Sequence, residues 1–439
     1  MLWSQNPWWR GREHIEEDED FARWKASSVR WVPSLLDKIG LEPYALHFVT
    51  GPRQVGKTTL LKLLVNSLLT RVKEKAIFYF RCDELSDFKE LDEVIKDYLK
   101  MRSIEGIKSS YIFLDEVTFP SEWYRAIKWH VDMGHFKNDI LVLTGSLSMF
   151  AKGEIETFPG RRGNGRDFIM YPLSFREFLK LVNREAFENI DASQNLNDIE
   201  ERCFRASPWL EELQKILELY LQCGGFPLSV KSFLEKGRIP SEVFTTYLSW
   251  IKGDLAKLKR SESLAKRVIK AIIEKVPSAL SFNSIAKEFE IKSHKTVFQY
   301  VDVLEKLFLA KVFYFIDPDK GTEVFYKQRK IHLTDPFLYN IFSYWCRTEK
   351  PEESILVESL VGAHLARKFN VGYWKNNREI DIVVLNDELT GIEVKYKKRP
   401  ELARVKIGRI KKVITLTIDV FSKDPPAIPV SVFLASLDV

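Results

Sequence analysis

Residues 51–58 read Gly-Pro-Arg-Gln-Val-Gly-Lys-Thr, which is the spacing of a phosphate-binding loop. Glycines at both ends let backbone N–H groups turn inward around phosphate oxygens. Lys57 is expected to reach the β- and γ-phosphates, and the Thr58 hydroxyl is expected to ligate Mg²⁺. The loop lies between the apolar residues 44–49 and a leucine-rich stretch, the strand–loop–helix order that such a loop requires. The predicted ligands of ATP are Gly51, Pro52, Arg53, Gln54, Val55, Gly56, Lys57, Thr58 and Thr59.

An Asp-Glu pair follows a buried-strand pattern at residues 111–116. Ligand sites of α/β proteins lie at the carboxyl ends of their strands. We therefore expect Asp115 to hold Mg²⁺ through water and Glu116 to act as the general base for the attacking water. The alternative is that the pair caps a helix near Ser121. At the end of the next strand, either Thr144 or Ser146 is expected to contact the γ-phosphate. A serine that only forms a turn is the alternative.

A second set of charged residues lies near the end of the chain. Asp381 begins one predicted strand, and Glu393 and Lys395 lie two apart on the next one, so both side chains project from one face. Glu358 lies in a predicted helix. This order resembles the PD-(D/E)XK restriction-endonuclease-like fold, with Ile380 in place of the signature proline. The resemblance implies that Asp381 and Glu393 bind Mg²⁺, that Lys395 is the catalytic lysine and that Glu358 is an auxiliary acid.

Two interpretations of this C-terminal set remain open. The basic residues 395–412 suit a phosphate backbone, which favours DNA as a partner and an intact nuclease site. The alternative is a degenerate nuclease fold in which the charges are ordinary cross-strand pairs, worth about 0.2–1 kcal/mol each.

The elements that position these residues follow from the apolar patterns. Strand and helix patterns alternate from residue 44 to residue 147, which predicts a parallel sheet flanked by helices. Residues 265–309 predict three helices, and residues 310–333 predict a hairpin, together a winged-helix arrangement. Lys292, His294 and Lys295 begin its last helix, where they could contact DNA, or the module could serve only for packing. The fold class is thus α/β: a P-loop ATPase core, a helical and winged-helix region, and a C-terminal α/β domain resembling restriction endonucleases.

Several of these motifs, taken in order, resemble the AAA-type ATPases related to the STAND class. The resemblance depends on the phosphate-binding loop, on residues 112–117 and 141–146, and on the segments around PGRRGNGR (159–166) and GGFPL (224–228). It implies that Arg161, Arg162 or Arg166 faces phosphate in this or a neighbouring subunit, with Arg162 taken as the catalytic candidate. It also implies that Pro227 contacts adenine. A solvated basic loop and a simple helix stop are the respective alternatives.

Size and composition limit the remaining possibilities. The 439 residues, with a net charge of +6, predict several domains and permit nucleic-acid binding. The absence of a long apolar run predicts no membrane partner, and four scattered cysteines favour the cytoplasm. The predicted domains are a Trp-rich segment (1–45) packing on the core, the ATPase core (46–175), a helical lid region (176–262), a winged-helix domain (263–345) and a nuclease-like domain (346–439). Within the lid region, the polar residues 184–208 are expected to form a long loop.

These patterns together predict an ATP-hydrolysing enzyme that binds DNA and cuts it with Mg²⁺, with a homo-oligomer as one form it could take. The alternative is a STAND-type switch between ATP and ADP states, or a DNA-remodelling ATPase, whose C-terminal domain binds DNA without cutting it. Adenine is favoured over guanine because the chain lacks the Asn-Lys-x-Asp string of GTPases.

Overall fold

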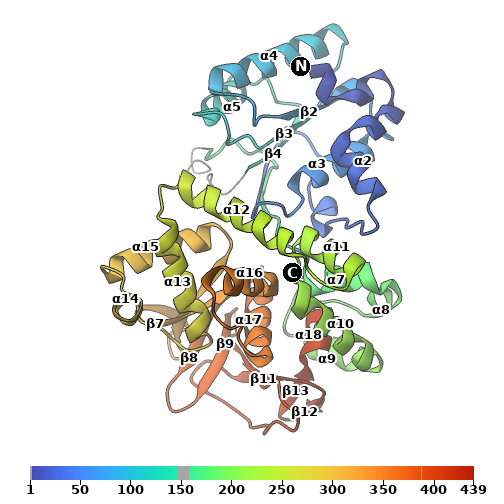
Figure 1. The fold of residues 1–439 in the computed structure, drawn as a ribbon. Coiled ribbons are helices and arrows are strands. Elements are labelled where there is room, and N and C mark those ends of the chain that lie inside the picture. The colour runs from blue at the N-terminus through green and yellow to red at the C-terminus, as the bar shows by residue number, and fades with distance from the viewer. Residues whose placement is uncertain (1, 146–157, 387) are drawn as a thin grey trace. The chain divides into compact units, whose positions relative to one another are not determined.

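A computed structural model describes residues 2–145, 158–386 and 388–439 of the chain. The chain divides into two compact units, residues 1–171 (unit 1) and 172–439 (unit 2), and Figure 1 shows the elements of both. Among the described helices, none is long and apolar enough to span a bilayer. The four cysteines are buried and unpaired.

Unit 1 contains a five-stranded sheet in the order β2-β3-β4-β1-β5, in which every neighbouring pair is parallel. The inner strands consist of buried apolar residues, as expected for a sheet covered on both faces. Its strands are β1 (Ala45–Thr50), β2 (Ile77–Arg81), β3 (Tyr111–Asp115), β4 (Ile140–Thr144) and β5 (Asp167–Ile169). Figure 1 shows α3 (Lys57–Leu68) on one face, with α4 (Phe88–Ile104) and α5 (Trp123–Asp132) on the other. The predicted parallel P-loop core is confirmed.

The Trp-rich N-terminal segment packs on this core beside β2. It forms α1 (Leu2–Gln5), α2 (Glu19–Ala26) and short 3-10 helices at Pro7–Arg10, Arg12–Glu17 and Ser34–Asp37; another at Glu74–Ala76 precedes β2. Trp8 and Trp9 are buried, and both indole N–H groups donate to the carbonyl oxygen of Ile77, at 3.2 and 2.9 Å. Burying the rings while satisfying their N–H groups explains why the indoles can leave water.

Unit 2 is built on one mixed sheet of eight strands, in the order β12-β13-β11-β10-β9-β8-β6-β7. The strands are β6 (Ala310–Asp317), β7 (Thr322–Leu333), β8 (Asn370–Lys375), β9 (Glu379–Leu385), β10 (Thr390–Val394), β11 (Lys412–Thr417), β12 (Ser422–Lys423) and β13 (Pro426–Pro429). The predicted hairpin β6–β7 does not stand apart from the C-terminal domain, because β6 pairs in parallel with β8. The boundary expected after residue 345 therefore falls inside one unit.

Helices pack against this sheet, and one of them, α17 (Glu353–Leu365), contacts strands β7 to β10. The helices are α7 (Phe175–Val182), α8 (Arg184–Asn189), α9 (Ile199–Arg205), α10 (Leu210–Cys223), α11 (Pro227–Lys236), α12 (Ser241–Lys257), α13 (Glu262–Lys275), α14 (Phe282–Glu288), α15 (His294–Lys306), α16 (Pro336–Cys346), α17 (Glu353–Leu365) and α18 (Val430–Ala435). Helix α17 is buried on all sides from Leu356 onward, as its apolar sequence requires. The expectation of a long loop at 184–208 is wrong, because α8 and α9 lie there and Cys203 and Ile199 of α9 are buried.

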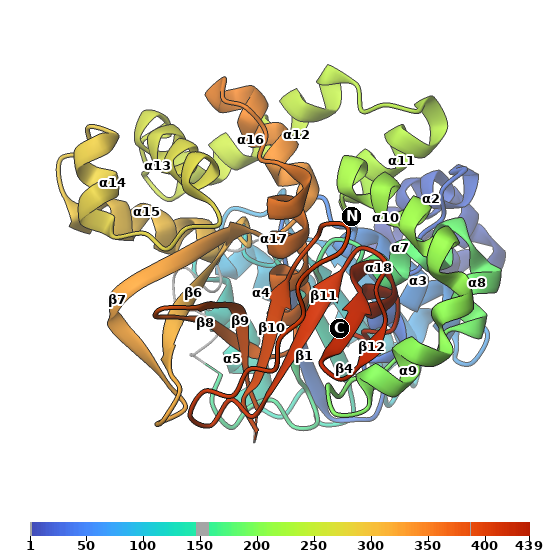
Figure 2. The ribbon, with the colours of Figure 1, turned by 90° about the horizontal axis from the view of Figure 1, so that it is seen from below.

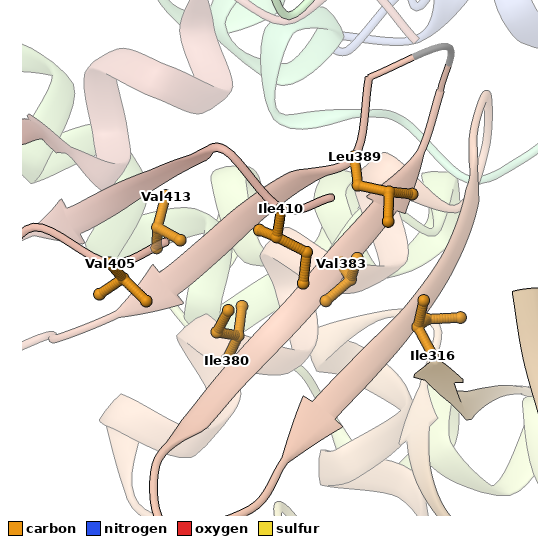
Figure 3. Close-up of a cluster of buried hydrophobic side chains, with 7 residues drawn as sticks. All are labelled: Ile316, Ile380, Val383, Leu389, Val405, Ile410 and Val413. Atoms are coloured by element: carbon orange, nitrogen blue, oxygen red, sulfur yellow. The ribbon is translucent and has the colours of Figure 1, made fainter. Parts of the chain in front are cut away.

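The basic stretch 395–412 covers part of the C-terminal sheet. Figure 3 shows Val405 and Ile410 of this stretch packed with Ile380 and Val383 of β9. The remaining members of this apolar cluster are Ile316, Leu389 and Val413. The stretch is thus anchored by its apolar residues rather than being a free basic tail.

Candidate functional site

The phosphate-binding loop has the backbone that its sequence predicts. Gly51 has φ of 150°, and a Cβ there would lie 2.2 Å from the carbonyl oxygen of Met170, so only glycine fits. Gly56, with φ of 95°, directly precedes α3. The Lys57 ammonium group donates to the carbonyl oxygens of Gly51 at 3.1 Å and Pro52 at 3.0 Å. A loop curled around a lysine at a helix N-terminus is suited to phosphate oxygens.

Asp115 is the centre of a hydrogen-bond network at the carboxyl end of β3. Its carboxylate is fully buried and accepts hydrogen bonds from the hydroxyl of Thr58 at 2.6 Å, from Thr144, and from the hydroxyl of Tyr79 at 3.0 Å. A threonine hydroxyl beside a carboxylate is the oxygen-donor pair that Mg²⁺ prefers with phosphates. These residues therefore fit a Mg²⁺–nucleotide group, which would be held by Thr58 and Asp115.

Tyr79 was missed by the sequence analysis, and it links the site to the N-terminal segment. Burial, reinforced by Asp115, raises the pKa of Tyr79 well above its ordinary value, so the hydroxyl keeps its proton. The ammonium of Lys62, on α3, lies 3.1 Å from the centre of the Tyr79 ring. Lys62 is 2% exposed and pairs with Asp18 at 2.7 Å. Asp18, Lys62, Tyr79 and Asp115 thus form a continuous chain of contacts.

Tyr79→Phe is expected to raise the Mg²⁺ concentration for half-maximal ATP hydrolysis by about tenfold, since a hydrogen bond to a charged acceptor contributes about 1.5 kcal/mol or more. The ring and its contact with Lys62 remain, so folding is expected to persist. The measurement is a Mg²⁺ titration of ATP turnover, with Tyr98→Phe as the control, because the Tyr98 hydroxyl donates to the carbonyl oxygen of Lys75 instead. An unchanged Mg²⁺ dependence would show that Tyr79 does not position Asp115.

Glu116 follows Asp115 with a positive φ of 50°, a left-handed conformation that is uncommon for residues other than glycine. Its N–H donates to the Thr144 hydroxyl at 3.1 Å. Its carboxylate makes no hydrogen bond or ion pair with the residues that the structure describes. The capping alternative is wrong, because α5 begins at Trp123 and has Glu122 at its N-cap. Ser146, the alternative to Thr144, lies outside the described residues.

The three candidate arginines differ in their surroundings. Arg161 pairs with Asp132 at 2.6 Å, and Arg162 pairs with Asp167. Arg166 is exposed and forms no ion pair with any described residue. Contact with a phosphate of a neighbouring subunit would require Arg162 to leave Asp167, whereas Arg166 has no such partner to leave.

The GGFP turn begins a helix of unit 2. A Cβ on Gly224 would lie 2.0 Å from Asp335 Oδ1, and the N–H of Gly225 donates to Asp335 Oδ2 at 2.9 Å. Burial raises the pKa of Asp335 to about 6. Pro227 occupies the first turn of α11. These contacts account for the glycines structurally, and the contact of Pro227 with adenine stays a prediction.

Two of the four predicted nuclease residues of unit 2, Glu358 and Asp381, contact a lysine that the sequence did not single out. The ammonium group of Lys330, on β7, contacts Glu358 at 2.9 Å, Glu379 at 2.7 Å and Asp381 at 3.5 Å. Lys330 is fully buried and Glu358 is 7% exposed. These four residues are the Lys330 cluster.

Electrostatics within the Lys330 cluster follow from this arrangement. Burial alone lowers the pKa of Lys330, but the three carboxylates together raise it above its ordinary value. Burial and the neighbouring Asp381 raise the pKa of Glu358 to about 7, against the lowering effect of Lys330. Burial also raises the pKa of Asp381. The lysine therefore remains charged and partly neutralises the acids around it.

The other two predicted nuclease residues are engaged elsewhere. Glu393 pairs with Arg378 at 2.9 Å, and Lys395 lies 3.5 Å from Glu393 and donates to the carbonyl oxygen of Glu401 at 2.7 Å. Within the described ranges, no group of three or more His, Cys, Asp or Glu side chains is arranged to hold a metal ion. Of the two predicted metal ligands, Asp381 lies beside the ammonium group of Lys330 and Glu393 pairs with Arg378.

The region expected to be a winged helix contains the three expected helices followed by the expected hairpin. Helices α13, α14 and α15 are followed by β6–β7, and Leu280 forms an antiparallel bridge with Arg329 of β7. The Ser293 hydroxyl caps α15 by accepting from the N–H of Thr296. Lys292, His294 and Lys295 are exposed at the start of α15.

Two family models match parts of the chain. Residues 44–179 match a family described as an AAA domain, and residues 214–346 match a domain of unknown function (DUF8612). The first match contains the phosphate-binding loop, Asp115 and Glu116, so this part of the chain is an AAA-type P-loop ATPase domain, for which nucleotide is the expected ligand. The second ends before Glu358 and does not include the predicted nuclease residues.

Three proteins that match larger parts of the chain are distant from it in sequence. An uncharacterized protein of Methanocaldococcus jannaschii, MJ1637, is 25% identical over 287 residues, which cover 63% of this chain and 58% of that protein. The Aeropyrum pernix ORC2 protein, solved as ADPNP–ADP complexes, is 14% identical with a TM-score of 0.38, over 71% of this chain and 90% of that chain. A Thermotoga maritima RuvB variant is 14% identical with a TM-score of 0.27, over 78% and 96%. Similarities at this level do not establish a shared fold.

Proposed function

We propose that the protein is an AAA-type ATPase whose second unit binds duplex DNA through a winged-helix arrangement and does not cut it. In unit 1, Lys57 and the loop glycines bind phosphates, Thr58 and Asp115 hold Mg²⁺, and Glu116 polarises the attacking water. An arginine of a neighbouring subunit, Arg166 or Arg162, would stabilise charge on the phosphate.

The Lys330 cluster is the observation that favours binding over cleavage. Two-carboxylate nucleases need a divalent cation between their acids to polarise the phosphate and the water. In this protein an ammonium group contacts Glu358 and Asp381. Unlike a divalent cation, it cannot coordinate a water molecule and lower the pKa of that water. The ATP and ADP states would then change how DNA is held, rather than license its cleavage.

DNA binding is supported by the charge at the start of α15. Lys292, His294 and Lys295 are exposed beside a helix N-terminus, where a winged-helix module meets phosphates and bases. Lys292→Glu combined with Lys295→Glu is expected to weaken binding to a duplex at least about tenfold. The slope of its salt dependence should fall by about one for each phosphate that is no longer neutralised. Fluorescence anisotropy at several salt concentrations measures both.

Lys306→Glu is the matched control, because Lys306 lies at the other end of α15 and pairs with Asp302 at 2.9 Å. The same preparations are incubated with plasmid DNA and Mg²⁺ or Mn²⁺, with and without ATP. Binding without cleavage is the expected result. Loss of binding in the control as well, or no binding by the wild type, would refute the assignment of DNA to α15.

Metal-dependent cleavage is the second candidate. Asp381 Oδ2 accepts the N–H of Val394 at 2.8 Å, which places Asp381 beside the Glu393–Lys395 segment as the nuclease arrangement requires. Cutting by the wild type that is lost in Asp381→Asn and Lys395→Ala would support this candidate and contradict the binding-only proposal.

A further inference from the structure

The hairpin β6–β7 contains an unusually large bulge. Tyr314 pairs with Arg329, and the next residue of β6, Phe315, pairs with Val324, so residues 325–328 have no pairing partner among the described residues of β6. Common bulges insert a single residue. Strand β7 is the outermost strand of its sheet, and Figure 2 shows it bent midway along its length.

Side chains hold this bulge in a defined shape. The Arg329 guanidinium donates to the carbonyl oxygens of Phe325 at 3.1 Å and Lys327 at 3.3 Å. The Tyr373 hydroxyl donates to the carbonyl oxygen of Gln328 at 2.7 Å. Three carbonyl groups of the bulge are therefore satisfied by side chains from within unit 2, so the bulge is an ordered feature of the hairpin.

Two large aromatic side chains are exposed on this bulge. Phe325 is 62% exposed and its ring lies 4.9 Å from that of Tyr314, while Tyr326 is 88% exposed. Lys327 follows them and is also exposed, with its ammonium group 3.7 Å from the centre of the Phe315 ring. Two adjacent exposed rings on an ordered bulge point to a binding role, unlike single exposed residues scattered over a surface.

Ring contacts through α14 link the residue that follows the bulge to α15. The Arg329 guanidinium lies 4.2 Å from the centre of the Phe282 ring, and the Phe282 ring lies 6.0 Å from that of Phe298 on α15. Phe298 is itself 50% exposed. We refer to Phe298, Phe325, Tyr326 and Lys327, the exposed residues of these two linked elements, as the aromatic–basic face. Lys295 lies one helical turn before Phe298.

We propose that the aromatic–basic face binds the unpaired strand at a junction between double-stranded and single-stranded DNA. This inference builds on the proposed function, in which α15 binds the duplex, and adds the class of DNA. Every base has a ring face, so exposed aromatic side chains stack on unpaired bases without regard to sequence, while lysines contact the phosphates. Bases within an intact duplex are already stacked and are not accessible to Phe325 and Tyr326.

The same observations disfavour a peptide added to the edge of the sheet. Strand addition uses the free carbonyl and N–H groups of an edge strand. At the bulge, three carbonyl oxygens already accept hydrogen bonds from Arg329 and Tyr373. The bulge also interrupts the regular edge that a second strand would need.

The test compares binding of a blunt duplex and of the same duplex carrying a single-stranded tail, by fluorescence anisotropy with the full chain. We expect the wild type to bind the tailed duplex at least about tenfold more tightly, since each base stacked on an aromatic side chain strengthens binding. Phe325→Ala combined with Tyr326→Ala is expected to abolish this preference while changing blunt-duplex affinity less than about twofold. Tyr326→Trp is expected to retain it.

Tyr344→Ala is the matched control, because Tyr344 is 54% exposed on α16, outside the face. Circular dichroism confirms that each variant is folded. Equal affinity of the wild type for the two DNAs, or a preference that survives the double substitution, would overturn the inference and leave duplex binding by α15 intact. Failure of the wild type to bind either DNA would instead overturn the proposed function. A change in molecular mass on light scattering, without any change in DNA preference, would identify the face as an interface between copies and also overturn the inference.

Discussion

Lys330→Met is expected to lower the free energy of unfolding of unit 2 by about 3–5 kcal/mol, because removing one partner of a buried ion pair leaves uncompensated charge. Lys330 contacts Glu358, Glu379 and Asp381, all within 3.5 Å, and is itself fully buried. Methionine keeps most of the apolar volume, so the loss would reflect charge rather than a cavity. Chemical denaturation followed by circular dichroism measures it.

The cost of Lys330→Met should depend on pH. In the wild type, the carboxylates raise the pKa of Lys330, so its stabilising contribution is constant well below pH 10 and is lost only as pH rises through that raised value. The pKa of Glu358 is already about 7 with the lysine present, and it should rise further without it. At pH values between the ordinary carboxyl pKa and this raised pKa, Glu358 is protonated in the folded variant but ionised in the unfolded chain. The free energy of unfolding of the variant therefore falls as pH rises through this range. We expect a larger loss at pH 8 than at pH 5.

Added Mn²⁺ should partly restore the stability of Lys330→Met at pH 8, because the three carboxylates would then lack their cation, and a ligand that binds the folded state stabilises it. The wild type should not respond. Lys327→Met, on the same strand but exposed, is the matched control. Its ammonium group lies 3.7 Å from the centre of the Phe315 ring, so its loss should lower stability by no more than about 1 kcal/mol. A variant as stable as the wild type at both pH values would refute the role of Lys330 as the cation of this cluster.

Glu116→Gln is expected to reduce the kcat of ATP hydrolysis by about 100-fold or more, because a positioned general base contributes about 10²–10⁴-fold. The amide keeps the size of the side chain but cannot accept the proton of water. Affinity for ATP should remain within a few fold, since phosphate binding depends on Lys57 and the loop backbone. Phosphate release and binding of a fluorescent ATP analogue are measured in parallel.

Glu122→Gln is a close control for this experiment. Glu122 also has a positive φ, 53°, but its carboxylate pairs with Arg125 at 2.9 Å on the surface. Its substitution should leave turnover unchanged. If Glu116→Gln hydrolyses ATP at the wild-type rate, another group activates the water. If it loses ATP binding as well, Glu116 has a structural role in the loop.

The geometry of the predicted nucleotide site could be anticipated because it depends on residues that are local in the chain. The glycine spacing of residues 51–58 determines a backbone that closes around phosphate, and a run of apolar residues before Asp115 places its carboxylate at a strand end. Parallel pairing of β1, β3 and β4 then brings Thr58, Asp115 and Thr144 together, because the carboxyl ends of parallel strands meet at one edge. Strand and helix patterns were sufficient for this part.

The polar segment 184–208 shows where pattern alone was insufficient. Its many charged and amide residues resemble a loop, yet α9 forms there because Ile199 and Cys203 are buried, one helical turn apart. The burial of these two residues depends on distant elements such as α18, and the Cys203 thiol lies 3.9 Å from the carbonyl oxygen of Val432. Local composition carries no information about such a partner.

By itself, the sequence determined the phosphate-binding loop, the Asp115–Glu116 pair and the order of the elements, since each depends on neighbours within a few residues. Only the tertiary structure decided which side chains surround Asp115 in unit 1 and Glu358 and Asp381 in unit 2. Tyr79 contacts Asp115 from 36 positions away, and Lys330 contacts Glu358 and Asp381 from 28 and 51 positions away. Those contacts arise from which strands become neighbours in a sheet, and the parallel pairing of β6 with β8 brings the hairpin carrying Lys330 against the predicted nuclease residues. The periodicity of a single strand specifies which residues lie on each face of the sheet, but not which strands lie beside it. Lys330, the cation beside Glu358 and Asp381, comes from β7, a strand whose place in the sheet the periodicity does not specify.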